Sequence, residues 1–149
     1  MYRDCFTTWV FVVLLAGCLS PIFAEDRPAV AVWSFDGDLV DRSGRGNDAF
    51  AASAAYAAGQ SGQGLRCGKE AVVVPDSPEL RPAPGLQIEC WVKLDALGTS
   101  WQPLLIKNGE FQLRLDPPGE GGHFSFFLHT DGWEPRVHSE AAAMVGVWY

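Results

Sequence analysis

The sequence lacks the features on which several large classes of protein depend. Its 149 residues contain 11 Lys and Arg against 18 Asp and Glu, and no run of basic residues offsets the net charge of −7. A surface that follows nucleic-acid phosphates therefore has no electrostatic basis, and nucleic acid is excluded as a partner. The four cysteines, Cys5, Cys18, Cys67 and Cys90, contain no close C-x-x-C pair, which excludes a zinc ribbon and a thioredoxin-type site.

The N-terminal segment has the composition of an export signal. Arg3 precedes an apolar run at 9–17, and small residues and Pro21 follow, a pattern typical of a secretory signal peptide. The run is shorter than the roughly 20 apolar residues that a membrane-spanning helix needs, and no later segment is long enough. We therefore expect no transmembrane segment and a location in the periplasm, the cell envelope or the extracellular space.

Two processing sites compete within this segment. Residues 15–18, Leu-Ala-Gly-Cys, resemble a lipobox, which predicts a leader of residues 1–17 and a lipid anchor on Cys18. Residues 22–24, Ile-Phe-Ala, resemble an ordinary signal-peptidase site, which predicts a signal peptide of residues 1–24. Labelling with a radioactive fatty acid separates the two, because only the lipoprotein incorporates label.

Export also bears on the remaining cysteines. An oxidising destination favours a disulfide between Cys67 and Cys90, a closure typically worth about 2–4 kcal/mol. The alternative is two buried thiols at apolar strand positions, and the sequence leaves both open.

Short strands separated by Gly, Pro and Asp turns fill the rest of the chain. Apolar and polar residues alternate over 86–94, and again over 111–116 and 123–129 on either side of a Pro/Gly turn. The second pair predicts a hairpin with one set of alternate residues facing the core: Phe111, Leu113, Leu115, Phe124, Phe126 and Leu128. Further strands are expected near 29–35, 71–74, 134–138 and 145–149.

The alanine-rich stretch 49–58 has high helix propensity but lacks a charged face, and glycines close it. We therefore expect irregular loop and weak strand there. Seven or so short strands without an amphipathic helix predict an all-β fold, a two-sheet antiparallel sandwich or jelly roll.

Five motifs in order give a resemblance to a known family. They are Trp33–Gly37, Asp41–Asp48, Gly62–Cys67, Ile88–Lys93 and the closing Trp148–Tyr149. In this order and spacing the chain resembles laminin-G-like, concanavalin-A-like modules over residues 25–149. The alanine-rich stretch and Cys67, where an aromatic is more usual, depart from that pattern.

The resemblance implies a concanavalin A-like jelly roll and a role in binding or adhesion at glycans or other extracellular partners, sometimes with calcium. In such modules the Trp-Tyr pair begins a strand that several others follow. The resemblance therefore implies the N-terminal two-thirds of a domain, an incomplete sandwich of low stability alone.

No catalytic constellation stands out. Paired carboxylates of a glucanase need acidic residues at strand spacing, and the only match, Asp36 with Asp38 and Asp41, lies in a Gly-containing turn. No serine elbow is present. His123 and His129 lie six residues apart, about 20 Å along a strand, which is too far for one zinc ion. We therefore expect no enzymatic activity from this chain.

The turn at 36–48 is rich in hard oxygen ligands, which suit calcium. The candidate metal ligands are Asp36, Asp38, Asp41, Asn47 and Asp48. The alternative is that these side chains cap the turn.

Sugars bind to aromatic faces and to polar groups in shallow sites. Trp101 and Trp133 are the two tryptophans in turn surroundings. The candidate ligand-binding residues are Trp133, Trp101, Asp131, His129 and Arg136. For Trp133 the alternative is a loop side chain that caps the end of the sandwich.

The sequence thus predicts an exported, non-catalytic recognition or adhesion module that binds carbohydrate or another extracellular surface component. The alternative is an accessory domain of an envelope enzyme, a glycoside hydrolase or similar, whose catalytic part lies outside this chain. A purely structural envelope lipoprotein is a third interpretation, and it depends on Cys18.

Overall fold

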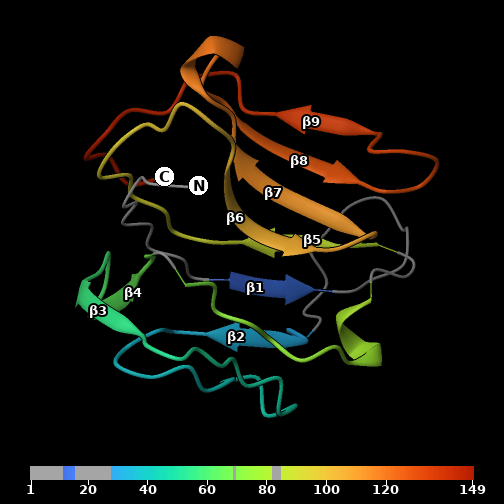
Figure 1. Cartoon of the computed structure of the whole chain (residues 1–149). Helices are drawn as coiled ribbons and strands as arrows, with labels where there is room; N and C mark the ends of the chain where they lie inside the picture. The colour runs from blue at the N-terminus through green and yellow to red at the C-terminus, as the bar shows by residue number, and fades with distance from the viewer. Residues whose placement is uncertain (1–11, 16–27, 69, 82–84) are drawn as a thin grey trace.

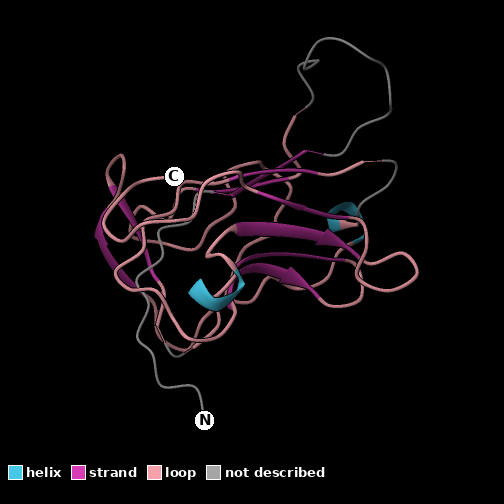
Figure 2. Ribbon diagram, turned by 90° about the horizontal axis from the view of Figure 1, so that it is seen from above, coloured by secondary structure: helices cyan, strands magenta, loops and turns pink. Residues whose placement is uncertain are grey.

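The protein is built almost entirely from antiparallel β-strands, as a computed structural model shows (Figures 1 and 2). The structure describes residues 28–68, 70–81 and 85–149, and the backbone alone of 12–15. The strands are β1 (Val12–Leu15), β2 (Ala31–Trp33), β3 (Ala55–Ala58), β4 (Gln63–Arg66), β5 (Gln87–Glu89), β6 (Gln102–Lys107), β7 (Phe111–Leu115), β8 (Phe124–Leu128) and β9 (Arg136–His138). The prediction of an all-β chain is confirmed.

Helix is confined to two short 3₁₀ turns, Pro78–Leu80 and Pro118–Glu120, among the residues that the structure describes. Both begin at proline, whose fixed φ suits the first position of a helical turn. Neither is long and apolar enough to cross a membrane.

The largest sheet joins strands that follow one another in sequence, in the order β6-β7-β8-β9 (Figure 1). Across β7 and β8, Phe111 lies opposite Leu128, Leu113 opposite Phe126, and Leu115 opposite Phe124. Residues directly opposite one another share a face of the sheet. The predicted hairpin and its set of six apolar residues on one face are therefore confirmed.

The burial of that sheet differs from the expectation. Leu115 and Phe124 lie in or against the core, but on β8 the most buried residues are Ser125 and Phe127, which belong to the opposite face. Phe126 and Leu128 are only half-buried. The reason is that side chains from β7 and β9, described below, cover the second face.

A three-stranded sheet has the order β2-β1-β5, with β1 antiparallel to both neighbours (Figure 1). β1 comes from the apolar run of the predicted signal peptide. The segments of this sheet are thus far apart in sequence.

The alanine-rich stretch forms strand β3, which pairs with β4 in a hairpin. Its turn depends on Gly59, because a Cβ at that position would come within 2.7 Å of the Gln63 carbonyl oxygen. The prediction of a weak strand in place of a helix is confirmed.

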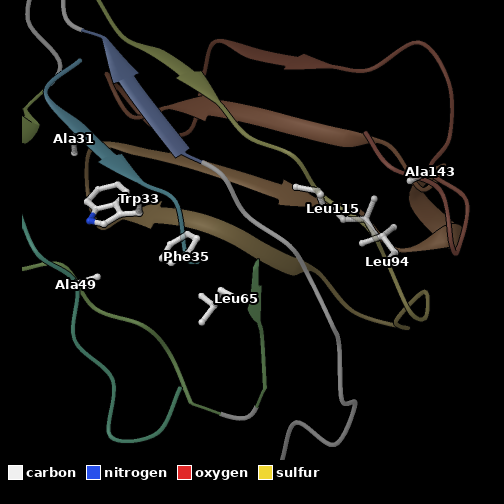
Figure 3. Close-up of a cluster of buried hydrophobic side chains, with 9 residues drawn as sticks. Ala31, Trp33, Phe35, Ala49, Leu65, Leu94, Leu115 and Ala143 are labelled. Atoms are coloured by element: carbon white, nitrogen blue, oxygen red, sulfur yellow. The ribbon is translucent and has the colours of Figure 1, made fainter. Parts of the chain in front are cut away.

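The core lies between these sheets (Figure 3). Its buried members come from several elements and are Ala31, Trp33, Phe35, Ala49, Leu65, Val92, Leu94, Leu115 and Ala143. Trp33 is anchored by its indole Nε1, which donates to the Asn47 carbonyl at 2.8 Å. Phe35 has a left-handed φ of 53°, which turns the chain out of β2 while its ring stays buried.

The alternation predicted over 86–94 is present in β5 and in the residues on either side of it. Leu86, Ile88 and Cys90 pack against the core, whereas Gln87, Glu89 and Trp91 are exposed. Near the end of the chain, the Val92 and Tyr149 backbones exchange two hydrogen bonds of 2.8 Å. The strand expected at 145–149 is therefore present only as a bridge between Lys93 and Trp148.

Candidate recognition site

The second face of the β6–β9 sheet carries a cluster of polar and aromatic side chains centred on Arg114. Arg114 lies opposite Pro103 on β6 and Ser125 on β8, so it points away from Leu115 and the core. Its guanidinium carbon lies 4.2 Å from the centre of the Trp101 ring and 4.4 Å from that of Phe127. Two aromatic rings thus hold a buried cation, an arrangement that their negative faces favour.

Asp116 lies beneath this cation and is completely buried. It accepts hydrogen bonds from Arg114 Nε at 2.8 Å, from Arg136 Nη2 at 2.6 Å and from the Ser125 hydroxyl. Burial acts to raise the pKa of Asp116, but the Ser125 and Arg114 hydrogen bonds and the charges of Arg114 and Arg136 outweigh it and lower the pKa. Asp116 is therefore an ionised anchor that fixes both arginines.

Trp101 forms the outer layer of the site. Its indole Nε1 donates to the two carboxylate oxygens of Glu120, at 3.0 and 3.1 Å. The residue is nevertheless 54% exposed. Arg114 covers one face of the ring, so that face does not account for this exposure. We call the set Trp101, Arg114, Asp116, Glu120, Ser125, Phe127 and Arg136 the Arg114 cluster.

The structure divides the predicted ligand-binding residues into two groups. Trp101 and Arg136 belong to the Arg114 cluster. His129, Asp131 and Trp133 lie in the loop after β8, where the His129 and Trp133 rings meet edge to face with centres 4.8 Å apart. The His129 amide bonds the Glu110 carbonyl, just before β7.

Trp101 and the loop after β8 sit at opposite ends of β7, since Trp101 adjoins Gln102, which pairs with Leu115, whereas His129 bonds Glu110. Four residue steps separate Phe111 from Leu115, about 13 Å along the strand. Trp133 is 38% exposed, so it is less open than Trp101.

Sequence reasoning missed the residues that organise the site. Arg114 occupies an outward position of β7 and Asp116 follows the end of that strand at the next alternate position, where alternation predicts solvent-exposed side chains. One signal was present: Phe127 interrupts the alternation of β8, because it places a large apolar ring on the supposedly polar face. An apolar residue out of phase indicates that the second face of a strand is covered.

The acidic turn at 36–48 is held together by its own side chains. Both oxygens of Asp41 accept two hydrogen bonds each, from the backbone of Val32, Ser43 and Asn47 and from the Ser43 hydroxyl. Burial acts to raise the pKa of Asp41, but these hydrogen bonds lower it. The Asp41 carboxylate thus caps the turn, which is the role that the sequence left open beside calcium binding.

The other candidate ligands of the turn also cap the chain. Asp36 accepts from the Gln63 amide, Asp38 from the Val40 amide, and Asp48 from the Asp41 amide. Asn47 donates to the Val30 carbonyl and accepts from Ser77. Among the described residues, no three His, Cys, Asp or Glu side chains form a group that could hold a metal ion. Calcium stays a prediction, which a melting temperature that falls on chelation would support and an unchanged one would remove.

Cys67 and Cys90 are thiols in the structure, both half-buried and packed against the core. Burial raises the pKa of the Cys90 thiol to about 11. The disulfide stays a prediction, tested by counting thiols on denatured, unreduced protein. Cys18 and both processing sites lie outside the described residues.

Comparisons with known proteins do not assign the chain to a family. No protein-family model matches the chain, and no curated protein or solved structure is similar enough to count as a match.

Proposed function

We propose that the chain is an exported, non-catalytic recognition module of the laminin-G-like, jelly-roll type, and that it binds carbohydrate at the Arg114 cluster. The antiparallel all-β fold and the export signal in the sequence support this proposal. The cluster supplies the chemistry that a shallow sugar site needs, an open aromatic ring with charged hydrogen-bonding groups beside it.

The observation that carries the proposal is the fixed and open ring of Trp101. Arg114 holds one face of the ring, Glu120 holds its edge, and more than half of the residue remains exposed. A ring already fixed in place loses little side-chain entropy when a ligand stacks on it. Arg136, whose side chain is 35% exposed, offers donors to sugar hydroxyls nearby.

The carboxylates of the cluster support a binding role over a catalytic one. Asp116 is buried, ionised and bonded to two arginines, so it has neither access nor a proton to transfer near neutral pH. Glu120 is engaged by Trp101. A glycosidase needs one carboxyl of raised pKa beside an ionised partner, whereas the pKa of Asp116 is lowered.

Affinity electrophoresis of the full chain against a panel of soluble polysaccharides tests the proposal. We expect one or more to retard the protein, and Trp101→Ala to weaken that binding by roughly 30-fold, since a central Trp is worth about 2 kcal/mol. Trp91→Ala is the matched control, because Trp91 is also exposed, at 47%, but lies outside the cluster.

Two further variants sharpen the test. Trp101→Phe keeps an aromatic face but loses the hydrogen bond to Glu120, so we expect it to retain more binding than Trp101→Ala. Trp133→Ala tests the second group at the other end of β7. Equal retardation of wild type and Trp101→Ala, or retardation by no polysaccharide in the panel, would contradict the proposal.

A further inference from the structure

Two histidines meet on the second face of the β6–β9 sheet, outside the Arg114 cluster. His123 immediately precedes β8 and His138 ends β9, two strands that lie side by side (Figure 1). The His123 carbonyl accepts from the Asp116 amide at 2.9 Å, so the pairing of the sheet continues to this residue. His138 lies opposite Ser125, which makes His123, two residues before Ser125, its diagonal neighbour on the same face.

The distance between the two rings is the one that a shared metal ion requires. Their centres are 5.1 Å apart and their planes are tilted by 48°, so the rings are not stacked face to face. A zinc–nitrogen bond of about 2.0–2.1 Å puts the centre of each imidazole about 3.2 Å from the metal. Two imidazoles at a tetrahedral angle therefore have centres about 5 Å apart, and His123 and His138 need little movement to reach that separation.

The hydrogen bond of His138 fixes which of its nitrogens is open to a metal. Nδ1 lies 3.0 Å from the Ser139 carbonyl oxygen. A carbonyl can only accept, so Nδ1 carries a proton and Nε2 of the neutral ring keeps its lone pair. Histidines that bind a metal commonly donate the other ring nitrogen to a backbone carbonyl in this way. His138 is exposed, so an ion can approach the ring from solvent.

The ring of His123 is held in place but is incompletely satisfied. One edge lies against Gly121, where a Cβ would come within 2.6 Å of Cδ2 and 2.7 Å of Nε2. Nδ1 is buried and has no hydrogen-bond partner within the part of the chain that the structure describes. A buried nitrogen without a partner is costly. Contact between the two rings leaves this nitrogen unpaired, whereas coordination of an ion by Nδ1 would satisfy it.

We propose that His123 and His138 form a site for one divalent transition-metal ion such as Zn²⁺, held by Nδ1 of His123 and Nε2 of His138. Imidazole nitrogens suit Zn²⁺ and Cu²⁺, whereas Ca²⁺ and Mg²⁺ prefer oxygen. Among the described residues no third His, Cys, Asp or Glu completes the pair, so water fills the remaining positions of the ion and leaves the site open.

The charges around the pair permit a cation. Arg136, the basic residue of β9, lies two positions before His138, but its guanidinium is paired with Asp116 at 2.6 Å. The chain as a whole has a net charge of −7, which favours the approach of a cation. Neither histidine belongs to the Arg114 cluster, so metal binding stands or falls independently of sugar binding.

Titration of the untagged full chain with ZnCl₂ alone tests the site, followed by NMR correlations of the histidine ring nitrogens. A pH of about 7.5 suits the titration, because an imidazole must be deprotonated to bind a metal. The chain has three histidines, and His129 is the internal control, since its ring contacts Trp133 in the loop after β8. We expect Zn²⁺ to shift the ring signals of His123 and His138 together and to leave those of His129 unchanged. Ca²⁺ should shift none of the three.

Calorimetric titration with Zn²⁺ measures the affinity of wild type and variants. We expect His138→Ala, a change at an exposed position, to bind Zn²⁺ at least about tenfold more weakly, because even groups behind a ligand are worth 10–100-fold. His129→Ala should bind as wild type does. His123→Ala should show the same loss as His138→Ala, and the wild-type ring signals decide the question if that variant does not fold.

Three outcomes would overturn the proposal. They are equal Zn²⁺ affinity of wild type and His138→Ala, equal shifts of all three histidine rings, and no binding of Zn²⁺ by wild type.

Discussion

The two main sheets are assembled from the chain in different ways. The β6–β9 sheet is a meander in which each strand pairs with the next along the chain, and the Arg114 cluster covers its second face. The β2-β1-β5 sheet joins three distant segments, and its middle strand comes from the predicted leader. The comparison teaches that local pairing makes a sheet independent of the rest of the chain, whereas distant pairing leaves it open to loss or exchange of a strand.

The largest effect expected from breaking the first sheet comes from Asp116→Ala. This change leaves Arg114 and Arg136 without their buried partner, and loss of one member of a buried ion pair costs about 3–5 kcal/mol. Urea unfolding monitored by tryptophan fluorescence measures it.

Asp76→Ala is the matched control, because Asp76 also pairs with two cations, Arg81 and Lys107, but at an exposed site. Exposed ion pairs contribute little to stability, because water and salt screen them, so we expect a much smaller loss. Similar losses for the two variants would show that the Arg114 cluster is no better organised than a surface ion pair.

The second sheet is broken by Val13→Pro in the full chain. Proline removes one backbone donor from a strand bonded on both sides, and we expect a loss of about 1–3 kcal/mol, because a buried backbone acceptor is left unpaired. Val13→Ala keeps the backbone donor and is the control. Thermal unfolding by circular dichroism distinguishes them, and indistinguishable melting of the two variants would place β1 outside the folded sheet.

Low pH tests the β6–β9 sheet, because it protonates Asp116, which holds the two arginines of the Arg114 cluster. The pKa of Asp116 is lowered from its ordinary 3.8, so its contribution to stability is fully present above about pH 5 and is lost as the pH falls through the folded-state pKa. The stability difference between wild type and Asp116→Asn should therefore shrink from pH 7 to pH 2. The comparison with this variant is needed because Asp41 and Asp76 also have lowered pKa values.

The smallest effect concerns thiol reactivity beside the core. With its pKa raised to about 11, the Cys90 thiol carries about a thousandth of its population as thiolate at pH 8. We expect iodoacetamide to modify Cys90 in folded protein at least tenfold more slowly than in urea. Mass spectrometry of the labelled peptides measures this, and failure to label in urea without reductant would instead support the disulfide.

Much of the fold follows from residues that are near one another in sequence. The Phe111–Leu128 hairpin, the β3–β4 hairpin and the exclusion of helix from the alanine-rich stretch could all be predicted, because alternation and turn chemistry act over a few residues. The role of residues 12–15 could not, since an apolar β-branched run suits a signal peptide and a central strand equally well.

Only the more exposed residues of the candidate site could be predicted from the sequence. Trp101 and Arg136 could be named, because a Trp in a turn and an Arg near another loop Trp suggest recognition. Arg114 and Asp116 could not, because only the register of β7 against β6 and β8 brings them between Trp101 and Phe127. Cross-strand neighbours depend on which strands pair, and alternation alone does not specify that.

The sequence by itself determined the antiparallel strands, their turns and the apolar set on β7 and β8, because these depend on the period of two along each strand. Only the tertiary structure decided that the second face of β8 is buried beneath two arginines and that β2 and β5 share a middle strand. Both outcomes depend on contacts between distant segments, where burial of charge and the pairing of backbone groups are settled by neighbours in space.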